Sequence, residues 1–287
     1  MIYVDCEQGT EEWFRSRCGV ITASTFADAV STVNGLTKQQ AIYVDVIRAG
    51  GSEAEAMEKA DYKAKPKADV VARAIAGLPV GEPSDASQKL AMTKAIERIS
   101  AQPYGNQGQQ GRFFATERGH EGEDFARWRY QTRMRVMVDQ AGVALTDDRL
   151  FGYSSDGFVG DDGLIEVKVP LDPLKVLHII QTGDISEYMY QMQGGMWITH
   201  RKWCDFLMGV PDLACLNNGN ELYIQRVWRD DNFIETMERQ LWAFAGRVKA
   251  LERLLRTPYG ETVVTSTPAA PAANESPKLS WREAAAA

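Results

Sequence analysis

The residues best suited to chemistry lie between Asp156 and Lys168, in a segment that carries two acids and a lysine at informative spacing. The alternation of polar and apolar residues predicts a strand with Glu166 and Lys168 on one face and Ile165 and Val167 on the other. A turn can bring Asp156 to the same edge. Carboxylate oxygens suit Mg²⁺ or Mn²⁺, and a nearby lysine suits a phosphate oxygen or an attacking water. The segment is therefore a candidate site for metal-assisted phosphate chemistry.

A solvent-exposed hairpin with no catalytic role is the alternative interpretation of this segment. The run Gly160-Asp161-Asp162-Gly163 predicts a tight turn, and Asp-Gly and Glu-x-Lys sequences are common in ordinary hairpins. The segment alone leaves both interpretations open, so the rest of the chain must decide between them.

Three further blocks of sequence accompany this hairpin, and all four follow a fixed order along the chain. They cover residues 9–24, 119–124, 156–170 and 188–199. Taken together, the blocks resemble the phage lambda exonuclease family, also called YqaJ-type viral recombinases, within the PD-(D/E)xK nuclease superfamily. The resemblance implies an α/β fold of the α+β type, in which helices flank a mixed central sheet in a restriction-endonuclease-like core.

The same resemblance implies a metal-binding set built from three acids and one main-chain carbonyl. Asp156 and Glu166 would bind the metal with Glu123, and the carbonyl of Val167 would complete the set. Glu121 is the alternative to Glu123, because helix boundaries inferred from sequence shift by a residue or two. Three carboxylates at one place need a cation between them, since their mutual repulsion otherwise raises at least one pKa.

The catalytic roles implied by the resemblance fall on Lys168 and Gln193. Lys168 would orient or activate the attacking water, and Gln193 would hold the lysine or the water through its amide. A lysine among carboxylates is favoured in its charged form, so we expect electrostatic positioning more than simple base catalysis.

A second group of polar residues, Arg17 and Ser24, lies near the N-terminus. The pattern predicts a short helix over 25–30 with Ser24 or Thr22 as its N-cap, and a helix N-terminus attracts phosphate. Arg17 could add a bidentate contact. An ordinary capped helix beside a surface arginine is the alternative. In the family, the matching arginine and serine bind the 5′-phosphate of a DNA end, and the resemblance implies that role here.

The activity implied by the resemblance is Mg²⁺-dependent digestion of double-stranded DNA from a 5′ end, which leaves a 3′ single strand for recombination. A ring-shaped homotrimer and cooperation with a single-strand annealing protein are implied as well. An endonuclease of the same superfamily and a DNA-end-binding module that has lost catalysis are the alternatives. The presence of Asp156, Glu166 and Lys168 argues against the second alternative.

Composition bounds the class of protein without naming its chemistry. The 287 residues contain no apolar run of membrane-spanning length, and the start of the chain lacks signal-peptide features, so we expect a cytoplasmic protein. The family resemblance implies a phage or prophage protein in a bacterial host. The four cysteines include no Cys-x-x-Cys pair, which argues against disulfide, zinc and iron–sulfur sites. The net charge of −7 is unusual for a DNA enzyme, so phosphate binding must depend on local basic residues and metal.

Along the whole chain we expect a nuclease domain over 1–256, with a helical insertion at about 36–110. A disordered tail is predicted over 257–287. Three helical runs in the insertion are compatible with a DNA-binding helix-turn-helix or with a simple helical decoration. An apolar seam along 231–256 favours a helix packed on its own sheet over a subunit contact. Trp281 in the tail is either a partner-docking residue or without a role.

Two further helices are predicted around the site. Residues 117–136 should form a helix whose packed side carries Phe125, Trp128 and Thr132. Residues 186–199 should form another, in which the methionines pack in the core and Gly194 and Gly195 allow a neighbour to approach closely.

Overall fold

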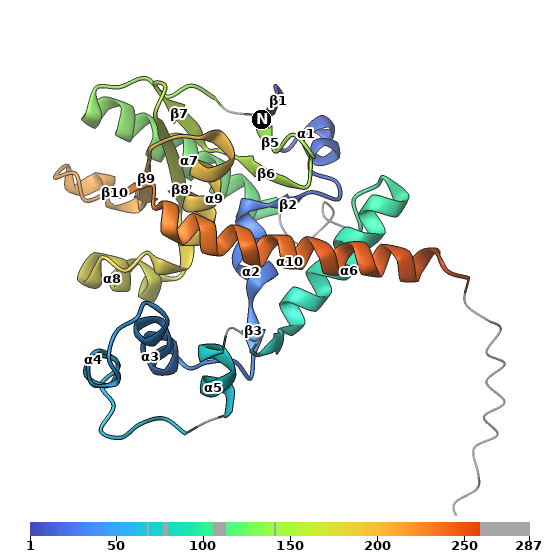
Figure 1. Ribbon diagram of the computed structural model, residues 1–287. Coiled ribbons are helices and arrows are strands. Elements are labelled where there is room, and N and C mark those ends of the chain that lie inside the picture. The colour runs from blue at the N-terminus through green and yellow to red at the C-terminus, as the bar shows by residue number, and fades with distance from the viewer. Residues whose placement is uncertain (68, 77–79, 106–112, 141, 259–287) are drawn as a thin grey trace, which may run out of the picture. The chain divides into compact units, whose positions relative to one another are not determined.

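The computed structural model describes residues 1–67, 69–76, 80–105, 113–140 and 142–258 (Figure 1). Side chains are described throughout these ranges except over 113–120. Residues 1–255 form one compact unit. The expected tail, apart from its first two residues, lies outside the described residues, and so does Trp281. Of the helices in the described part of the chain, none is both long and apolar enough to cross a membrane.

One sheet of four strands carries the predicted hairpin, in the order β10-β9-β8-β7. Its strands are β7 (Gly157–Val159), β8 (Gly163–Lys168), β9 (Trp203–Gly209) and β10 (Leu222–Trp228). The pair β8 and β9 is parallel and the other two pairs are antiparallel, so the sheet is mixed as predicted. A parallel pair needs a crossover, and two helices supply it: α8 (Pro173–Thr182) and α9 (Met189–Thr199).

A second sheet of four strands has the order β1-β5-β6-β2. Its members are β1 (Ile2–Val4), β2 (Ile21–Thr22), β5 (Val143–Leu145) and β6 (Phe151–Ser154). Because β6 ends at Ser154 and β7 begins at Gly157, the connection between the two sheets is only two residues long. Asp156 lies in this connection, directly before β7.

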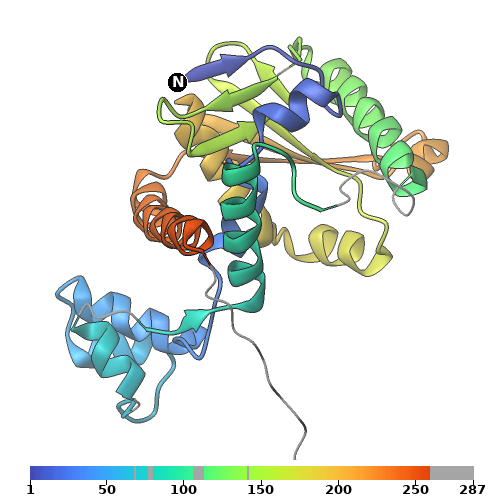
Figure 2. The same cartoon turned by 90° about the vertical axis from the view of Figure 1, so that its right-hand side faces the viewer.

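The main core lies between the sheets and the helices that cover them. Its buried side chains come from α2 (Phe26–Val30), α6 (Asp85–Ser100), α9 and α10 (Asp231–Arg256), together with both sheets. The seam of α10 is buried in this core, so the helix packs against the helices and strands of its own chain. The views in Figures 1 and 2 show α6 and α10 side by side, where Arg98 contacts Glu252.

The glycines of α9 allow the close approach that the sequence predicted. A Cβ on Gly194 would lie 2.6 Å from the Phe26 ring, and one on Gly195 would lie 2.7 Å from the Tyr153 ring. Met192 and Met196 are fully buried in the same core. Helix α9 therefore lies tightly between α2 and strand β6.

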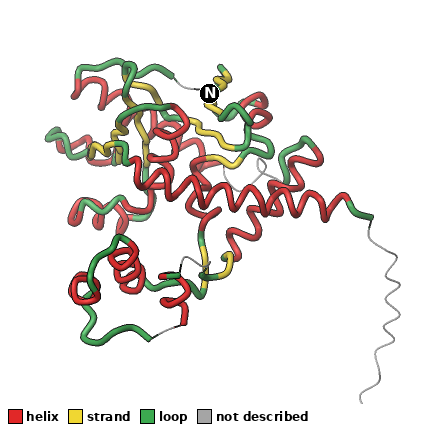
Figure 3. The backbone as a smooth tube through the Cα atoms, in the orientation of Figure 1, coloured by secondary structure: helices red, strands yellow, loops and turns green. Residues whose placement is uncertain are grey.

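Three short helices, α3 (Lys38–Arg48), α4 (Glu53–Lys59) and α5 (Asp69–Ile75), surround a hydrophobic cluster of their own. The two-stranded ribbon of β3 (Thr32–Val33) and β4 (Glu82–Pro83) joins this segment to the rest, as Figure 3 shows in yellow. Helix α6 also falls within the range 36–110 suggested for an insertion. Its Ala91 and Ala95 nevertheless pack in the main core.

The helix predicted over 117–136 is α7 (Phe113–Met134), but its packed side differs from the prediction. Trp128 is 54% exposed and Thr132 is exposed, whereas Ala126 and Tyr130 are buried. The packed side is the one that carries Ala126 and Tyr130: a Cβ on Gly209 of β9 would lie 3.1 Å from the Ala126 Cβ, and the Tyr130 hydroxyl donates to Asp205 Oδ2 of β9 at 2.6 Å.

Candidate active site

Strand β8 positions the central acid and lysine of the site. Glu166 is fully buried and Lys168 is partly exposed at the end of the strand. Their side chains share one face, and Lys168 Nζ donates to Glu166 Oε1 at 2.5 Å. On the opposite face, Ile165 and Val167 pack with α7 in a second core cluster. The period of two predicted from the sequence therefore holds in the structure.

Asp156 reaches the same edge through the backbone of β8. Gly157 pairs with Ile165, so strand pairing on this edge of β8 stops two residues before Val167. The Asp156 carboxylate takes the next position, where it accepts a hydrogen bond from Val167 N at 2.6 Å. Because the N–H and C=O of a strand residue point to the same edge, the Val167 carbonyl faces this edge too.

Helix α7 brings the third acid, Glu123, to the site. A Cβ on Gly122 would lie 2.9 Å from the Val169 side chain, so this glycine lets the helix approach the end of β8. Glu123 lines the same pocket as Asp156 and Glu166. The alternative residue, Glu121, is exposed and does not line the pocket.

Burial and mutual repulsion make these acids hold protons more tightly than usual. Burial, with the nearby Asp156 carboxylate, raises the pKa of Glu123 to about 7. Burial also raises the pKa of Glu166 to about 7, although Lys168 opposes the shift, and it raises the pKa of Asp156. Burial disfavours the charged form of Lys168, but the Glu166 and Asp156 carboxylates prevail and raise its pKa. The lysine is therefore a cation at neutral pH.

The donor atoms fit a hard divalent cation in type, since three carboxylates and one carbonyl oxygen face one pocket. In the described residues, however, no group of three or more His, Cys, Asp or Glu has metal-ligand geometry as it stands. Lys168 holds Glu166, and the Val167 N–H holds Asp156. A cation bound here would compete with these donors for the carboxylate oxygens.

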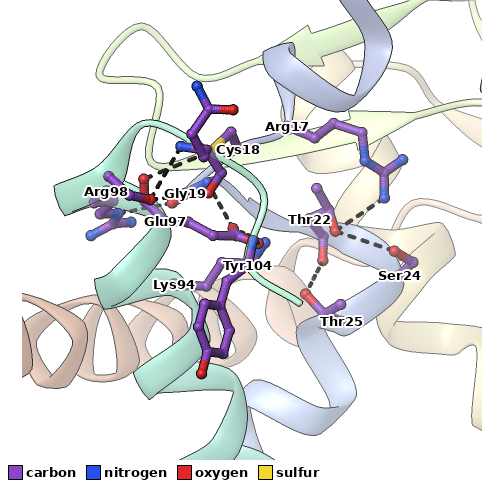
Figure 4. Close-up of polar contacts among 12 residues, drawn as sticks. Arg17, Cys18, Gly19, Thr22, Ser24, Thr25, Lys94, Glu97, Arg98 and Tyr104 are labelled. Atoms are coloured by element: carbon purple, nitrogen blue, oxygen red, sulfur yellow. Dashed lines mark hydrogen bonds and ion pairs between the residues drawn. The ribbon is translucent and has the colours of Figure 1, made fainter. Parts of the chain in front are cut away.

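The polar residues Arg17, Thr22 and Ser24 from the N-terminal segment line the same pocket. The Arg17 guanidinium stacks over the Trp13 ring, 4.0 Å from its centroid, and Trp13 Nε1 donates to Ser154 Oγ at 2.8 Å. Arg17 Nη2 lies 3.5 Å from Thr22 Oγ1, which in turn lies 3.2 Å from Ser24 Oγ (Figure 4). Burial lowers the pKa of Arg17 to about 10, so the side chain keeps its charge at neutral pH.

The predicted helix cap at this place is wrong. Ser24 lies inside a 3-10 turn, Ala23–Thr25, and α2 begins only at Phe26. Neither Thr22 nor Thr25 caps a helix with its side chain. Because α2 has only five residues and no side-chain cap, the polar groups that this segment offers to the pocket are the Arg17 guanidinium and the Thr22 and Ser24 hydroxyls rather than a helix terminus.

Gln193 does not occupy the position predicted for it beside Lys168. It is fully buried, its Nε2 donates to Trp228 O at 2.9 Å, and its Oε1 accepts from Asp230 N at 3.0 Å. These bonds fix the connection between β10 and α10. Gln191 lines the pocket instead. Two residues along a helix rotate a side chain by about 200°, so the two glutamines face opposite sides.

The pocket that collects these groups has a volume of about 180 Å³. It unites all the predicted site residues except Gln193, and it adds several that the sequence interpretation did not single out for the site. The lining residues are Gln8, Trp13, Arg17, Thr22, Ser24, Glu123, Tyr153, Ser154, Asp156, Glu166, Val167, Lys168 and Gln191.

Tyr153 is the most consequential of the added residues. Its ring is buried, and its hydroxyl lies 3.3 Å from Glu166 Oε2. Its position three residues before Asp156, on a strand that ends at the site, is the signal that sequence reasoning could have used.

Comparison with known proteins places this geometry in context. Residues 12–202 match the family described as the YqaJ-like viral recombinase domain. No curated protein matches the sequence. Two solved structures of LHK-Exo, an alkaline exonuclease from Laribacter hongkongensis, are 27% identical and cover 86% of this chain. The structure in complex with dAMP has a TM-score of 0.60 with 96% of its chain covered, and the other has 0.58 with 97% covered.

A phage-related exonuclease from Haemophilus somnus 129PT is also similar, with 13% identity and a TM-score of 0.52. The match covers 82% of this chain and 96% of that one. At this identity the similarity concerns the fold alone.

Proposed function

The chain belongs to the YqaJ-like viral recombinase family, and from that premise we propose that it is a Mg²⁺-dependent exonuclease that digests double-stranded DNA from the 5′ end. Its fold is of the PD-(D/E)xK type, as the sequence predicted, and it is a nuclease of the lambda exonuclease kind. The dependence on metal, the direction of digestion and the nature of the product are the parts that we propose.

The observation that carries this proposal is the meeting of two groups in one pocket. Glu166, Asp156 and Lys168 come from the hairpin, whereas Arg17 and Ser24 come from a segment more than a hundred residues earlier. The first group suits metal-assisted attack on a phosphodiester, and the second suits a terminal phosphate. A pocket closed by a phosphate-binding arginine favours a DNA end over an internal position.

Each residue of the pocket has a role in the proposed reaction. Asp156, Glu166, Glu123 and the Val167 carbonyl would hold the metal. A bound Mg²⁺ or Mn²⁺ would stabilise the developing charge on phosphorus and lower the pKa of the attacking water. Because the pKa of Lys168 is raised, its ammonium group donates to the water or to a phosphate oxygen rather than accepting a proton. A cation held by Glu166 would leave this ammonium group available for that task.

The 5′-phosphate of the substrate would bind to Arg17, Thr22 and Ser24. Trp13 supports this contact, because its ring holds the guanidinium from one face and its N–H is itself fixed by Ser154. Gln191 completes the wall of the pocket and takes the supporting role expected of Gln193. The complex of LHK-Exo with dAMP supports 5′-mononucleotides as the product class. A homotrimer and an annealing partner protein remain predictions of the family resemblance.

Incubation with linear and with closed circular duplex DNA, each with Mg²⁺ or with EDTA, tests this proposal. We expect the linear duplex to be degraded with Mg²⁺ only, and the closed circle to stay intact. Cutting of the closed circle would favour an internal endonuclease, and binding of linear ends without cleavage would favour an inactive end-binding module.

A further inference from the structure

A buried group of charged residues at the end of α6 has no role in the proposed reaction. Glu97 is 3% exposed and Lys94 is 9% exposed, and Lys94 Nζ donates to Glu97 Oε2 at 2.8 Å. Arg98 follows on the same helix and forms an ion pair with Glu252 of α10 at 3.2 Å. Figure 4 shows this group beside the segment that carries Arg17.

The group contacts that segment at two adjacent residues: Cys18 Sγ donates to Glu97 O at 3.7 Å, and Gly19 makes the main-chain contacts. Gly19 N donates to Glu97 Oε2 at 2.9 Å, and Gly19 O accepts from Arg98 Nε at 2.8 Å. Adjacent residues of one helix thus hold both main-chain polar groups of the same glycine. Glu97 also accepts from Tyr104 N through Oε1 at 3.3 Å, so its two oxygens fix two separate stretches of chain.

Both the backbone conformation and the missing side chain of Gly19 are needed for this contact. Its φ of +72° lies in the left-handed region, and a Cβ would lie only 2.7 Å from Arg98 Cγ. The turn around it is closed by main-chain hydrogen bonds from Cys18 N to Arg15 O and from Val20 N to Arg17 O, both at 3.1 Å. Because the backbone of Arg17 is part of this turn, holding Gly19 also holds the start of the Arg17 side chain.

The chemistry of a buried ion pair favours a positioning role over one of stability alone. Replacing a buried ion pair by apolar residues of similar size often leaves stability unchanged or improves it. The Glu97 carboxylate accepts a directional hydrogen bond from the Gly19 N–H, which an apolar residue could not do. Lys94, which donates to the same Oε2 atom, holds the carboxylate in the orientation that this bond needs.

We propose that Glu97, held by Lys94 and assisted by Arg98, is a positioning residue that fixes the Gly19 turn and thereby aims Arg17 at the 5′-phosphate. The inference rests on the proposed function, because it gives Arg17 that task. Trp13 restrains the guanidinium at one end of the side chain, and α6 restrains the backbone at the other.

The test compares cleavage of duplexes that carry a 5′-phosphate with that of duplexes that carry a 5′-hydroxyl. In Lys94→Met/Glu97→Leu the ion pair becomes apolar and Gly19 loses its acceptor. We expect kcat/KM on 5′-phosphate ends to fall roughly tenfold or more, as misplacement of a binding group does, with the rate on 5′-hydroxyl ends unchanged. Lys94→Met/Glu97→Gln restores one acceptor oxygen and should recover part of the preference.

A matched control and a milder variant accompany these proteins. Lys65→Met/Glu53→Leu removes an exposed pair of the same two residue types, whose Nζ and Oε2 lie 2.7 Å apart, and should change nothing. Arg98→Lys keeps a charge near Glu252 but loses the fixed Nε, so it should reduce the preference even if the double variant fails to fold.

The outcomes separate this inference from the proposed function. If the unmodified protein prefers 5′-phosphate ends and Arg17→Ala loses that preference, the phosphate pocket stands. Full preference in folded Lys94→Met/Glu97→Leu and in Arg98→Lys would then overturn the inference alone, as would an equal loss of rate on both kinds of end. Equal rates on both ends with the unmodified protein would overturn the pocket and the inference together.

Discussion

Glu166 and Lys168 form an ion pair whose two members would have different tasks in the proposed reaction. The carboxylate is fully buried, and the lysine lies at the end of the strand where the pocket opens. A short contact between them stabilises both charges while no cation is present. The same contact keeps the ammonium group within reach of a phosphate oxygen that approaches the carboxylates.

We predict that Glu166→Gln and Lys168→Ala each reduce the cleavage rate with Mg²⁺ by on the order of 10²-fold or more, since each removes a charge that acts on the transition state. Binding to DNA ends and the far-UV circular dichroism spectrum should be retained. Lys202→Ala is the control, because Lys202 pairs with Asp162 on the exposed side of the same hairpin. A folded variant with a near-normal rate would remove Glu166 or Lys168 from the mechanism.

The raised pKa values of Glu123 and Glu166 predict how stability depends on pH. Their carboxyls titrate near 4.3 in the unfolded chain and at about 7 in the folded protein. The folded state therefore binds more protons between these values, so stability should fall as pH rises from about 4.3 to about 7. Above that window Mg²⁺ should restore stability, because it binds the deprotonated acids.

Melting temperatures at pH 5.5 and 8, in EDTA and in Mg²⁺, measure this effect. Glu166→Gln has no carboxyl to titrate at that position, so its melting temperature should depend less on pH and respond less to Mg²⁺. An identical pH dependence in both proteins would show that Glu166 is not the group that holds the extra proton.

Substitutions of Gln191 and Gln193 should have different effects, the first on activity and the second on stability. Gln191→Ala alters only the wall of the pocket, so we expect a slower reaction with an unchanged melting temperature. Gln193→Ala leaves Trp228 O and Asp230 N without their partner, which should lower the free energy of unfolding by about 1–3 kcal/mol. Kinetics and thermal melting of both variants check the assignment, and the reverse pattern would restore Gln193 to the site.

At the scale of elements, helix α9 positions the site because its glycines have no side chain and let neighbouring rings pack close to the helix. Gly195 makes room for the Tyr153 ring, and the Tyr153 hydroxyl lies against Glu166. A methyl group on Gly195 would push this ring, and hence the carboxylate that it contacts. The packing of α9 is thus connected to the geometry of the acids by a single side chain.

Gly195→Ala should therefore destabilise the protein by about 1–3 kcal/mol, as overpacking does, and should also reduce the cleavage rate. Gly246→Ala provides the matched control on α10, because nothing lies within 4 Å of a Cβ built there. That change should be neutral or stabilising by about 0.5–1 kcal/mol, since alanine favours helix. Similar melting temperatures for the two variants would mean that α9 can shift to admit the methyl group.

The sequence was sufficient to predict the elements whose pattern is local. The β7–β8 hairpin follows from its alternation and its Gly-Asp-Asp-Gly turn, and α10 follows from an apolar seam that extends over its whole length. The acid and lysine of β8 were predictable for the same reason, since a strand face is set by a period of two.

Positions that depend on helix rotation or on packing partners were not predictable from the sequence. Gln191 and Gln193 differ by two residues, and only the packing of α9 decides which of them faces the pocket. Trp128 was expected inside because it is large, whereas the rotation of α7 places Ala126 and Tyr130 against β9 and leaves Trp128 exposed. The hydrogen bonds that Gly19 forms with Glu97 and Arg98 of α6 join residues that are 78 and 79 positions apart in the sequence. No local pattern reveals such contacts.

For the whole molecule, the net charge of −7 requires that DNA binding be local. Arg17 and Lys168 are the cations that line the pocket, and they stand among three acids. Attraction of a DNA end should therefore depend on the divalent cation, which converts an acidic pocket into one that accepts phosphate. Such a pocket accounts for a nuclease that is acidic overall.

The direction of digestion is the most direct test of the central claim, that this pocket receives a 5′ end and cleaves next to it. A linear duplex is labelled either on its 5′-terminal nucleotides or on its 3′-terminal nucleotides, and the release of label is followed with Mg²⁺. The account predicts that 5′ label appears at once as mononucleotide, while 3′ label stays in long single strands. Early release of the 3′ label, or labelled internal fragments from either substrate, would contradict it.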